Sequence, residues 1–342
     1  MIVVPDKRLT KRTGCNARPA ELLWLTMSLF ALIALAGCGD NDEPSGTVAT
    51  QNAPHHLPEK SEADKSRSAD VSLRKAAEVL RRLELEEELR QAATLRKLNL
   101  FDTDATDDDL EQLVGLRTLE ELTLVGCAEV TNDGVRNLTA FDKLRVLYLG
   151  GPNISDDAIK SVGELKSLVE LHLNGPNFGD DGLAHLTELS GLAVLDLQGT
   201  QVTDAGLPHL ARMTHVERLN LIGTAITEAG LVHITKLDKL RQLQLSGPEM
   251  RDAGLSHLDR LTGLQSLTLM AAGITSAGVQ QLSHLTQLEQ LDLRFCEGIT
   301  DVVLPELRRL THLRDLDLRG TQLSAEAVAD LKQVLKRCTV RW

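Results

Sequence analysis

The chain has 342 residues and a formal net charge of −12, from 37 basic and 49 acidic residues, and only 2% of its residues are aromatic. This acidic balance argues against a nucleic acid or an anionic membrane surface as the partner, since both attract a positively charged protein. Five cysteines are few for the length, so the fold is expected to depend on an apolar core and not on disulfides.

Residues 1–37 are typical of a targeting segment. A basic head (Lys7, Arg8, Lys11, Arg12, Arg18) precedes the apolar run LLWLTMSLFALIALAG, which is short for a membrane span. The run ends in Leu-Ala-Gly-Cys at 35–38, which resembles the lipobox of bacterial lipoproteins and implies a lipid on Cys38 after cleavage before it. Gly39 after the cysteine favours the outer over the inner membrane. The alternative is an ordinary signal peptide, or an anchor helix with an incidental cysteine.

Two further segments precede the main part of the chain. Residues 38–69 contain almost no large apolar residue, which predicts a disordered tether. His55 and His56 in it are interpreted as solvated and not as metal ligands. Residues 70–94 carry Leu73, Ala77, Leu80 and Leu83 at helical spacing and are predicted to form an N-terminal helical cap over whatever follows.

A phrase of 24 or 25 residues then recurs ten times over residues 95–338. Its clearest copy, from Leu192, reads LAVLDLQGTQVTDAGLPHLARMTH. The copies begin at Leu95, Leu119, Leu144, Leu168, Leu192, Val216, Leu240, Leu264, Leu288 and Leu313. A fixed period of this size predicts a solenoid, in which each unit packs only against its neighbours.

Each copy predicts the same local structure, a short strand followed by a helix. Leu195 and Leu197 alternate with polar residues, as in a strand with one buried face. Thr203 is expected to cap a helix, with Asp204 in its positive first turn. Leu207, Leu210 and Met213 recur on one face of that helix. One repeat buries too little apolar surface to offset the entropy of ordering it, so stacking on its neighbours is obligatory.

The phrase resembles the leucine-rich repeat family, in the cysteine-containing-like subtype with ITDxGLxxL after the strand. The matching residues are Leu192, Leu195, Leu197, Thr200, Val202, Thr203, Asp204, Gly206, Leu207 and Leu210, with their equivalents in the other copies. The resemblance implies an α/β fold: an open solenoid with a parallel sheet on the concave face and short helices on the convex face. Residues 339–342 are predicted to add a terminal capping strand, with Trp342 as a lid.

Outward-pointing strand residues form three columns on the predicted concave face. The middle column reads Asn99, Thr123, Tyr148, His172, Asp196, Asn220, Gln244, Thr268, Asp292 and Asp317. Tyr148, His172 and Asp196 are therefore adjacent, with neighbours about 4.8 Å apart. As a catalytic site this would be a histidine oriented by a carboxylate, with tyrosine as proton partner. No nucleophile or oxyanion hole accompanies it, so a solvated row or a contact patch for a partner is favoured.

The contact patch is the predicted partner-binding site, because an aromatic residue and an arginine among apolar contacts are typical of a hot spot. It comprises Val146, Tyr148, Glu170, His172, Val194, Asp196, Arg218, Asn220 and Ile222. The last two repeats alternate acid and base (Asp292, Arg294, Asp317, Arg319) and are expected to neutralise themselves.

Two other patterns are interpreted as structural. His185, His209, His233 and His257 occupy one helix position in successive repeats, which could indicate zinc or a pH switch but follows from repetition alone. The acidic run at 102–109 has spacings found in calcium loops, but its last residues suit a helix N-terminus. No metal and no cofactor are expected.

Together these patterns predict a non-catalytic, lipid-anchored cell-envelope protein that binds a protein or peptide on its concave face. Two alternatives remain open: a substrate-recognition subunit of an enzyme complex, because the repeats also resemble those of F-box adaptors, and a passive structural component of the envelope.

Overall fold

The computed structural model of this protein describes residues 62–342, with side chains from residue 68 onward. The targeting segment, Cys38 and the tether up to residue 61 lie outside the described residues. The strands are β1 (Lys97–Asn99), β2 (Glu121–Val125), β3 (Val146–Gly150), β4 (Glu170–Leu173), β5 (Val194–Asp196), β6 (Arg218–Asn220), β7 (Gln242–Ser246), β8 (Ser266–Met270), β9 (Gln290–Asp292), β10 (Asp315–Asp317) and β11 (Thr339–Arg341).

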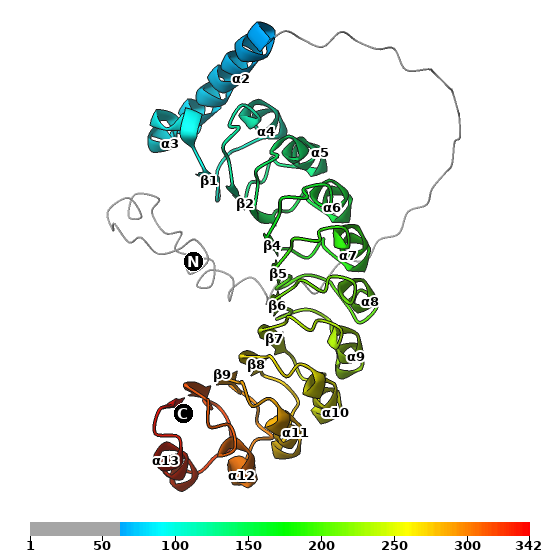
Figure 1. Cartoon of the computed structure of the whole chain (residues 1–342), viewed down its shortest axis with the longest axis vertical. Helices are drawn as coiled ribbons and strands as arrows, with labels where there is room; N and C mark the ends of the chain where they lie inside the picture. The colour runs from blue at the N-terminus through cyan, green and yellow to red at the C-terminus, as the bar shows by residue number, and fades with distance from the viewer. Residues whose placement is uncertain (1–61) are drawn as a thin grey trace, which may run out of the picture. The chain divides into compact units, whose positions relative to one another are not determined.

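Helices alternate with the strands and lie on the other side of the solenoid (Figure 1). The α-helices are α2 (Glu62–Arg82), α3 (Glu86–Arg90), α4 (Asp107–Leu113), α5 (Asn132–Arg136), α6 (Asp156–Val162), α7 (Asp180–Leu186), α8 (Leu207–Leu210), α9 (Leu231–Ile234), α10 (Asp252–Leu255), α11 (Ser276–Gln281), α12 (Leu304–Leu307) and α13 (Ala325–Val334). Short 3₁₀ turns are Ala92–Thr94, Asn137–Ala140, Glu228–Gly230, Ser256–Arg260, Leu282–His284 and Asp301–Val303. None of the described helices combines the length and the apolar character that a membrane span requires.

The strands form one parallel sheet in which each strand pairs with the next along the chain. The register confirms the predicted columns: Tyr148 pairs with His172, and His172 with Asp196. Leu195 lies between Leu171 and Leu219, and all three side chains are buried. The predicted open α/β solenoid with an inner parallel sheet is therefore confirmed.

The length of a strand depends on the residue in its middle column. Where that residue is Asn or Asp, as in β1, β5, β6, β9 and β10, the strand has three residues. The Asp196 carboxylate accepts the backbone N–H of Gln198 at 3.0 Å, whereas the equivalent N–H of Asn174 donates to the Leu149 carbonyl of the neighbouring strand. The side chain thus diverts one N–H from the sheet and ends the strand. Thr123, Tyr148, Gln244 and Thr268 make no such bond, and their strands have five residues.

The aspartate of the repeated Thr-Asp-x-Gly phrase joins one repeat to the next, and we call these contacts the aspartate ladder. Asp204 accepts the N–H of Thr227 at 2.9 Å and its hydroxyl at 2.6 Å. Asp107, Asp180 and Asp252 make the same two bonds in other repeats, and Asp156 and Asp301 make the N–H bond. The sequence pattern predicts Asp204 in the first turn of a helix, but it does not reveal the contact with the following repeat.

The glycine of the same phrase leaves room for this aspartate. A Cβ atom at Gly230 would overlap the Asp204 carboxylate, and one at Gly206 would overlap that of Asp180. The two residue types therefore recur together at five junctions, whereas Ala327 stands at the glycine position that follows Asp301.

The aspartate is replaced at three junctions. Asn132 and Ser276 still accept a backbone N–H of the next repeat, but between the sixth and seventh repeats the contact is lost. Glu228 replaces the aspartate there and Arg251 replaces the threonine. Among the described contacts none joins these two side chains, and one Glu228 carboxylate oxygen is buried without a hydrogen-bond partner. Because a buried unpaired acceptor costs free energy, this is a weak junction in the solenoid.

The N-terminal end of the solenoid is covered by α2, as Figure 1 shows. Ala76, Val79 and Leu80 of α2 are fully buried, and α2 packs against α4. Gly115 permits this close packing, since a Cβ atom there would overlap the Ser72 carbonyl of α2. The helix begins at Glu62, so the predicted boundary of the tether at residue 69 is wrong. Its start is rich in charged residues that form helices well, and Asp70 and Arg74 form an i,i+4 ion pair farther along it.

At the other end, β11 pairs with β10 and extends the sheet. Trp342 does not form a lid, because half of its surface (53%) is exposed. Val340 is the residue of this strand that packs into the core. The predicted lid is therefore wrong: alternation would place residue 342 on the same side as Val340, but Trp342 lies beyond the last residue of β11 and stays exposed.

Candidate partner-binding site on the concave face

The middle of the concave face carries one connected cluster of side chains from three strands. The rings of Tyr148 on β3 and His172 on β4 stack with centroids 4.2 Å apart and planes 10° apart. His172 Nε2 lies 2.8 Å from a Glu170 carboxylate oxygen, and His172 Nδ1 lies 3.2 Å from one of Asp196 on β5. Each side chain of this cluster therefore has its position fixed by its neighbours before any partner arrives.

Arg218 on β6 extends the cluster across an intervening strand. Its guanidinium lies 3.5 Å from the second Glu170 oxygen and spans the column position of Val194. Half of the Arg218 side chain is exposed, compared with 16% of His172. Arg218 is thus the member of the cluster that is most accessible to a partner.

The electrostatics of the cluster favour a charged histidine. Burial opposes protonation of His172, but its hydrogen bonds to Asp196 and Glu170 outweigh burial and raise the pKa of the imidazole. The same bond from His172 lowers the pKa of Glu170. Burial, with nearby carboxylates, raises the pKa of Tyr148 to about 12, so its phenol stays neutral near pH 7.

The geometry excludes the role of Tyr148 as proton partner of His172. Both imidazole nitrogens face carboxylates, and the tyrosine meets the flat face of the imidazole ring instead. Sequence spacing placed the two residues side by side but could not give the orientation of their rings. The stacking supports the ring of His172, and Tyr148 itself is only 6% exposed.

The remaining predicted site residues surround this cluster with unequal access. Val146 and Val194 are half-buried. Asn220 is buried, donates to the Gln198 side chain at 3.1 Å and accepts the N–H of Ile222. Ile222 is buried too. The structure therefore places eight of the predicted residues on the neighbouring strands β3 to β6 and Ile222 in the turn after β6, but Tyr148, Asn220 and Ile222 support the surface more than they form it.

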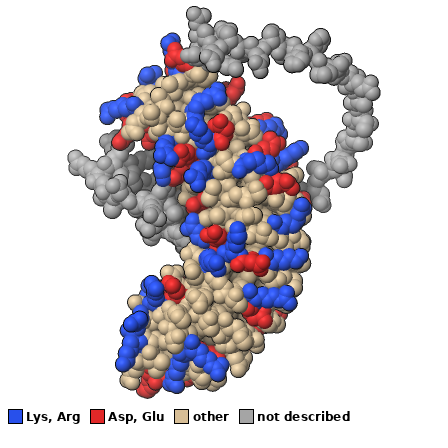
Figure 2. Space-filling model, in the orientation of Figure 1, with Lys and Arg blue, Asp and Glu red and all other residues tan. Residues whose placement is uncertain are grey.

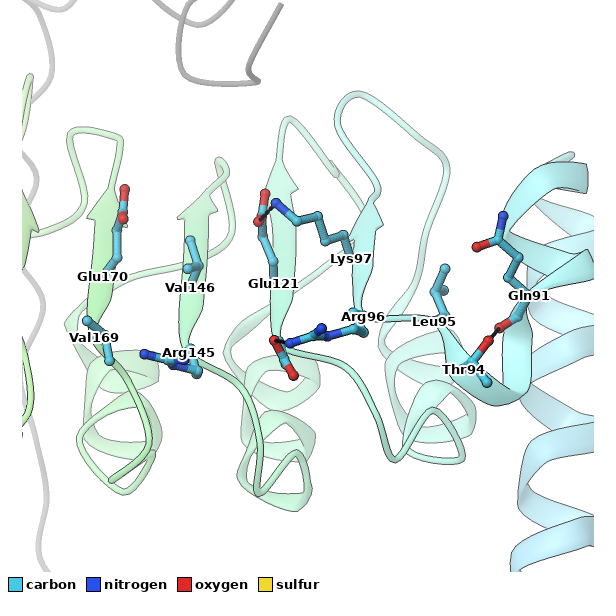
Figure 3. Close-up of a pocket in the computed structure, with 11 residues that line it drawn as sticks. Gln91, Thr94, Leu95, Arg96, Lys97, Glu121, Arg145, Val146, Val169 and Glu170 are labelled. Atoms are coloured by element: carbon cyan, nitrogen blue, oxygen red, sulfur yellow. Dashed lines mark hydrogen bonds and ion pairs between the residues drawn. The ribbon is translucent and has the colours of Figure 1, made fainter. Parts of the chain in front are cut away.

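A hollow of about 690 Å³ opens beside the cluster at the start of strands β1 to β4 (Figure 3). Its lining includes Val146 and Glu170 of the predicted site, together with Gln91 and Thr94 from the N-terminal cap. Arg96 pairs with Glu120, and Lys97 pairs with Glu121. Sequence reasoning missed Arg96, Glu120 and Arg145, because they lie one residue before the strands, outside the three columns considered.

Charges of both signs are interspersed over the face seen in Figure 2, without an extended region of one sign. The acidic run at 102–109 takes part in helix capping: Thr106 and Asp109 form a reciprocal capping box, and Arg82 of α2 pairs with Asp109. His209, His233 and His257 are half-buried on the convex side. In the part of the chain described, no group of three or more His, Cys, Asp or Glu is arranged to hold a metal ion.

Cys127 and Cys296 are free cysteines within the core of the described residues. Both thiols are buried and donate to carbonyl oxygens of the preceding repeat, Leu100 and Leu269. Burial raises the pKa of the Cys296 thiol to about 11, so this group is an inert part of the core.

Comparison with known proteins agrees with this geometry. Residues 309–331 match the sequence model described as Leucine Rich repeat. A chain of the Rad7 and Elc1 complex from yeast has a similar structure, with a TM-score of 0.56 and 19% identity over 82% of each chain. This is a leucine-rich-repeat fold. The similarity shows how these leucine-rich repeats are folded and leaves their partner to be found from the site itself.

Two internalins from Listeria monocytogenes also match these leucine-rich repeats. For internalin inlF the identity is 20%, over 68% of this chain and 70% of that one, with a TM-score of 0.49. For internalin C2 it is 20%, over 69% and 83%, with a TM-score of 0.42. No curated protein sequence matches the chain.

Proposed function

We propose that this leucine-rich-repeat protein is a non-catalytic binding protein of the cell envelope, held there by a lipid on Cys38, and that the middle of its concave face binds a protein or peptide. The observation that carries the binding role is the cluster of Tyr148, His172, Glu170, Asp196 and Arg218. Its side chains are already ordered by stacking and ion pairs, so binding costs little further side-chain entropy.

The composition of the cluster supports a protein partner. An accessible arginine beside a supported aromatic pair and two half-buried valines is the arrangement expected of an interface hot spot. Glu170 and Asp196 are already paired with His172 and Arg218. A partner therefore meets a surface of mixed polarity, which gives specificity through complementary charge and shape.

Capture of partners from an envelope extract tests this proposal. Wild-type protein is compared with Arg218→Ala on the concave face and with His209→Ala on the convex face. We expect one specific partner to be retained by wild type and His209→Ala and lost by Arg218→Ala. Retention by Arg218→Ala together with loss by His209→Ala would place the binding site on the convex face.

Anchoring is tested separately at Cys38. The proposal depends on the basic head, the short apolar run and the Leu-Ala-Gly-Cys sequence at 35–38. Without the Cys38 thiol no thioether to lipid can form, so Cys38→Ser is expected to abolish labelling by a radioactive fatty acid and to release the protein from the membrane fraction. Cys15→Ser is the matched control and should keep both properties. Continued labelling of Cys38→Ser would refute the anchor.

A further inference from the structure

The last repeats carry a second ordered surface, formed by Arg294, Phe295, Arg319 and Arg341, which we call the arginine–phenylalanine surface. It is built over a buried carboxylate, that of Asp317, whose side chain is only 3% exposed. Arg319 lies 2.7 Å from Asp317, Arg341 lies 3.1 Å from it, and Arg294 lies 3.9 Å from it. One buried anion therefore holds three guanidinium groups from neighbouring strands and turns.

Two acids of this region, Asp317 and Asp292, lie beneath the arginines, and a third, Asp315, pairs with Arg341 and is 35% exposed. The side chains of Asp317 and Asp292 are 3% and 19% exposed, whereas those of Arg319 and Arg341 are 52% and 48% exposed. Sequence analysis expected the alternating charges to neutralise themselves, and the pairing is as expected. The accessible groups, however, are mainly guanidinium N–H donors, since each arginine has five and the carboxylates below occupy only some of them.

Phe295 adds an exposed ring in a strained backbone conformation. Its φ is +61°, in the left-handed region, and it is 57% exposed. The equivalent positions Gly199, Gly223 and Gly320 are glycines with φ near +70°. Its ring lies over Gly320, where a Cβ atom would come within 2.7 Å of the ring carbon Cδ1. An aromatic residue kept exposed at the expense of backbone strain indicates a role in binding.

We propose that the arginine–phenylalanine surface binds an acidic segment of a partner protein. Its carboxylates are received by the outer N–H groups of Arg319 and Arg341, and an apolar side chain packs on Phe295. Guanidinium groups fixed in position match carboxylates through paired hydrogen bonds. A protein segment fits better than nucleic acid, because the chain has a net charge of −12 and carboxylates lie directly below the arginines.

This inference rests on the proposed function in that the concave face binds protein, but it uses a surface remote in sequence from Arg218. The test is fluorescence anisotropy of the full-length protein in detergent with a labelled octapeptide of sequence Asp-Glu-Leu-Asp-Glu-Leu-Asp-Glu. We expect the acidic peptide to bind at least about 10-fold more tightly than its Asn/Gln analogue and than a single-stranded DNA 12-mer.

Variants separate binding from folding. Phe295→Gly relieves the positive φ, so its Tm is expected to stay the same or rise, while peptide affinity falls about 5- to 30-fold. Ala271 occupies the same position one repeat earlier, with a φ of +51°. Ala271→Gly should give the same change in Tm with unchanged affinity. Arg319→Gln should weaken peptide binding as Phe295→Gly does. It should keep the fold, because Arg341 still pairs with Asp317.

Two outcomes would overturn the inference. One is equal binding of the acidic peptide and its Asn/Gln analogue, or tighter binding of DNA. The other is acidic-peptide binding that neither Phe295→Gly nor Arg319→Gln weakens. Arg218→Ala should leave peptide binding intact, because Arg218 belongs to the central binding site and not to the arginine–phenylalanine surface. Failure of the peptide experiment would therefore not count against the central binding site.

Discussion

Replacing Leu195 by Asp is expected to lower the free energy of unfolding by more than about 4 kcal/mol. Leu195 is fully buried in the fifth repeat, between Leu171 and Leu219 of the adjoining strands. No cation faces this position, since its neighbours are the leucines of the core, so the new carboxylate would be buried unpaired or protonated. Urea unfolding followed by circular dichroism measures the loss.

Val194→Asp is the matched control, because it introduces the same group one residue away on the outward side of the same strand. Val194 is half-buried and its column neighbour is Arg218, so the expected loss is about 1 kcal/mol or less. If Leu195→Asp costs under about 1 kcal/mol, or no more than Val194→Asp, the assignment of inward and outward residues is wrong.

Removing one carboxylate of the aspartate ladder is expected to cost about 2–3 kcal/mol. Asp204→Ala leaves both the N–H and the hydroxyl of Thr227 without their acceptor, and bonds to a charged group are among the stronger hydrogen bonds in proteins. The loss should appear as a lower urea midpoint at pH 7. Asp204 joins only the fifth repeat to the sixth, so the loss in free energy of unfolding measures the contribution of that one junction.

The chain offers its own control one repeat later. Glu228 occupies the equivalent position but has no contact with Arg251, and one of its oxygens is buried without a partner. Glu228→Ala removes no hydrogen bond from a neighbouring repeat and is expected to change stability by less than about 0.5 kcal/mol, or to stabilise the protein. Equal losses for Asp204→Ala and Glu228→Ala would show that the aspartate ladder contributes little to repeat stacking.

The architecture could be read from the sequence because a solenoid repeats one local pattern. Once Leu195 was assigned to the core, the same offset assigned its equivalents, and the register of the sheet followed from the 24-residue period. Positions where residues interact across repeats were harder to foresee. Asp204 looks like an ordinary helix-terminus acid within its own repeat, and only the glycine two residues beyond its equivalent in the next repeat signals the contact.

The candidate site could be predicted only in part, because sequence spacing gives the position of a residue in the sheet but not the orientation of its side chain. Spacing placed Tyr148, His172 and Asp196 in one row, and the structure places them so. Spacing says nothing of side-chain rotation, so the stacked rings and the burial of Tyr148 were missed. For the same reason the sequence could not show that the side chain of Asp317 lies below the surface and that of Arg319 lies on it.

The most direct test of the central claim is a titration of the captured partner against wild type, Arg218→Ala and His209→Ala by isothermal calorimetry. The account predicts that Arg218→Ala weakens binding by about 1–3 kcal/mol, or roughly 5- to 150-fold in Kd, with an unchanged unfolding midpoint. His209→Ala should bind as wild type does. Unchanged affinity for Arg218→Ala, with a loss for His209→Ala, would contradict a binding site at the middle of the concave face.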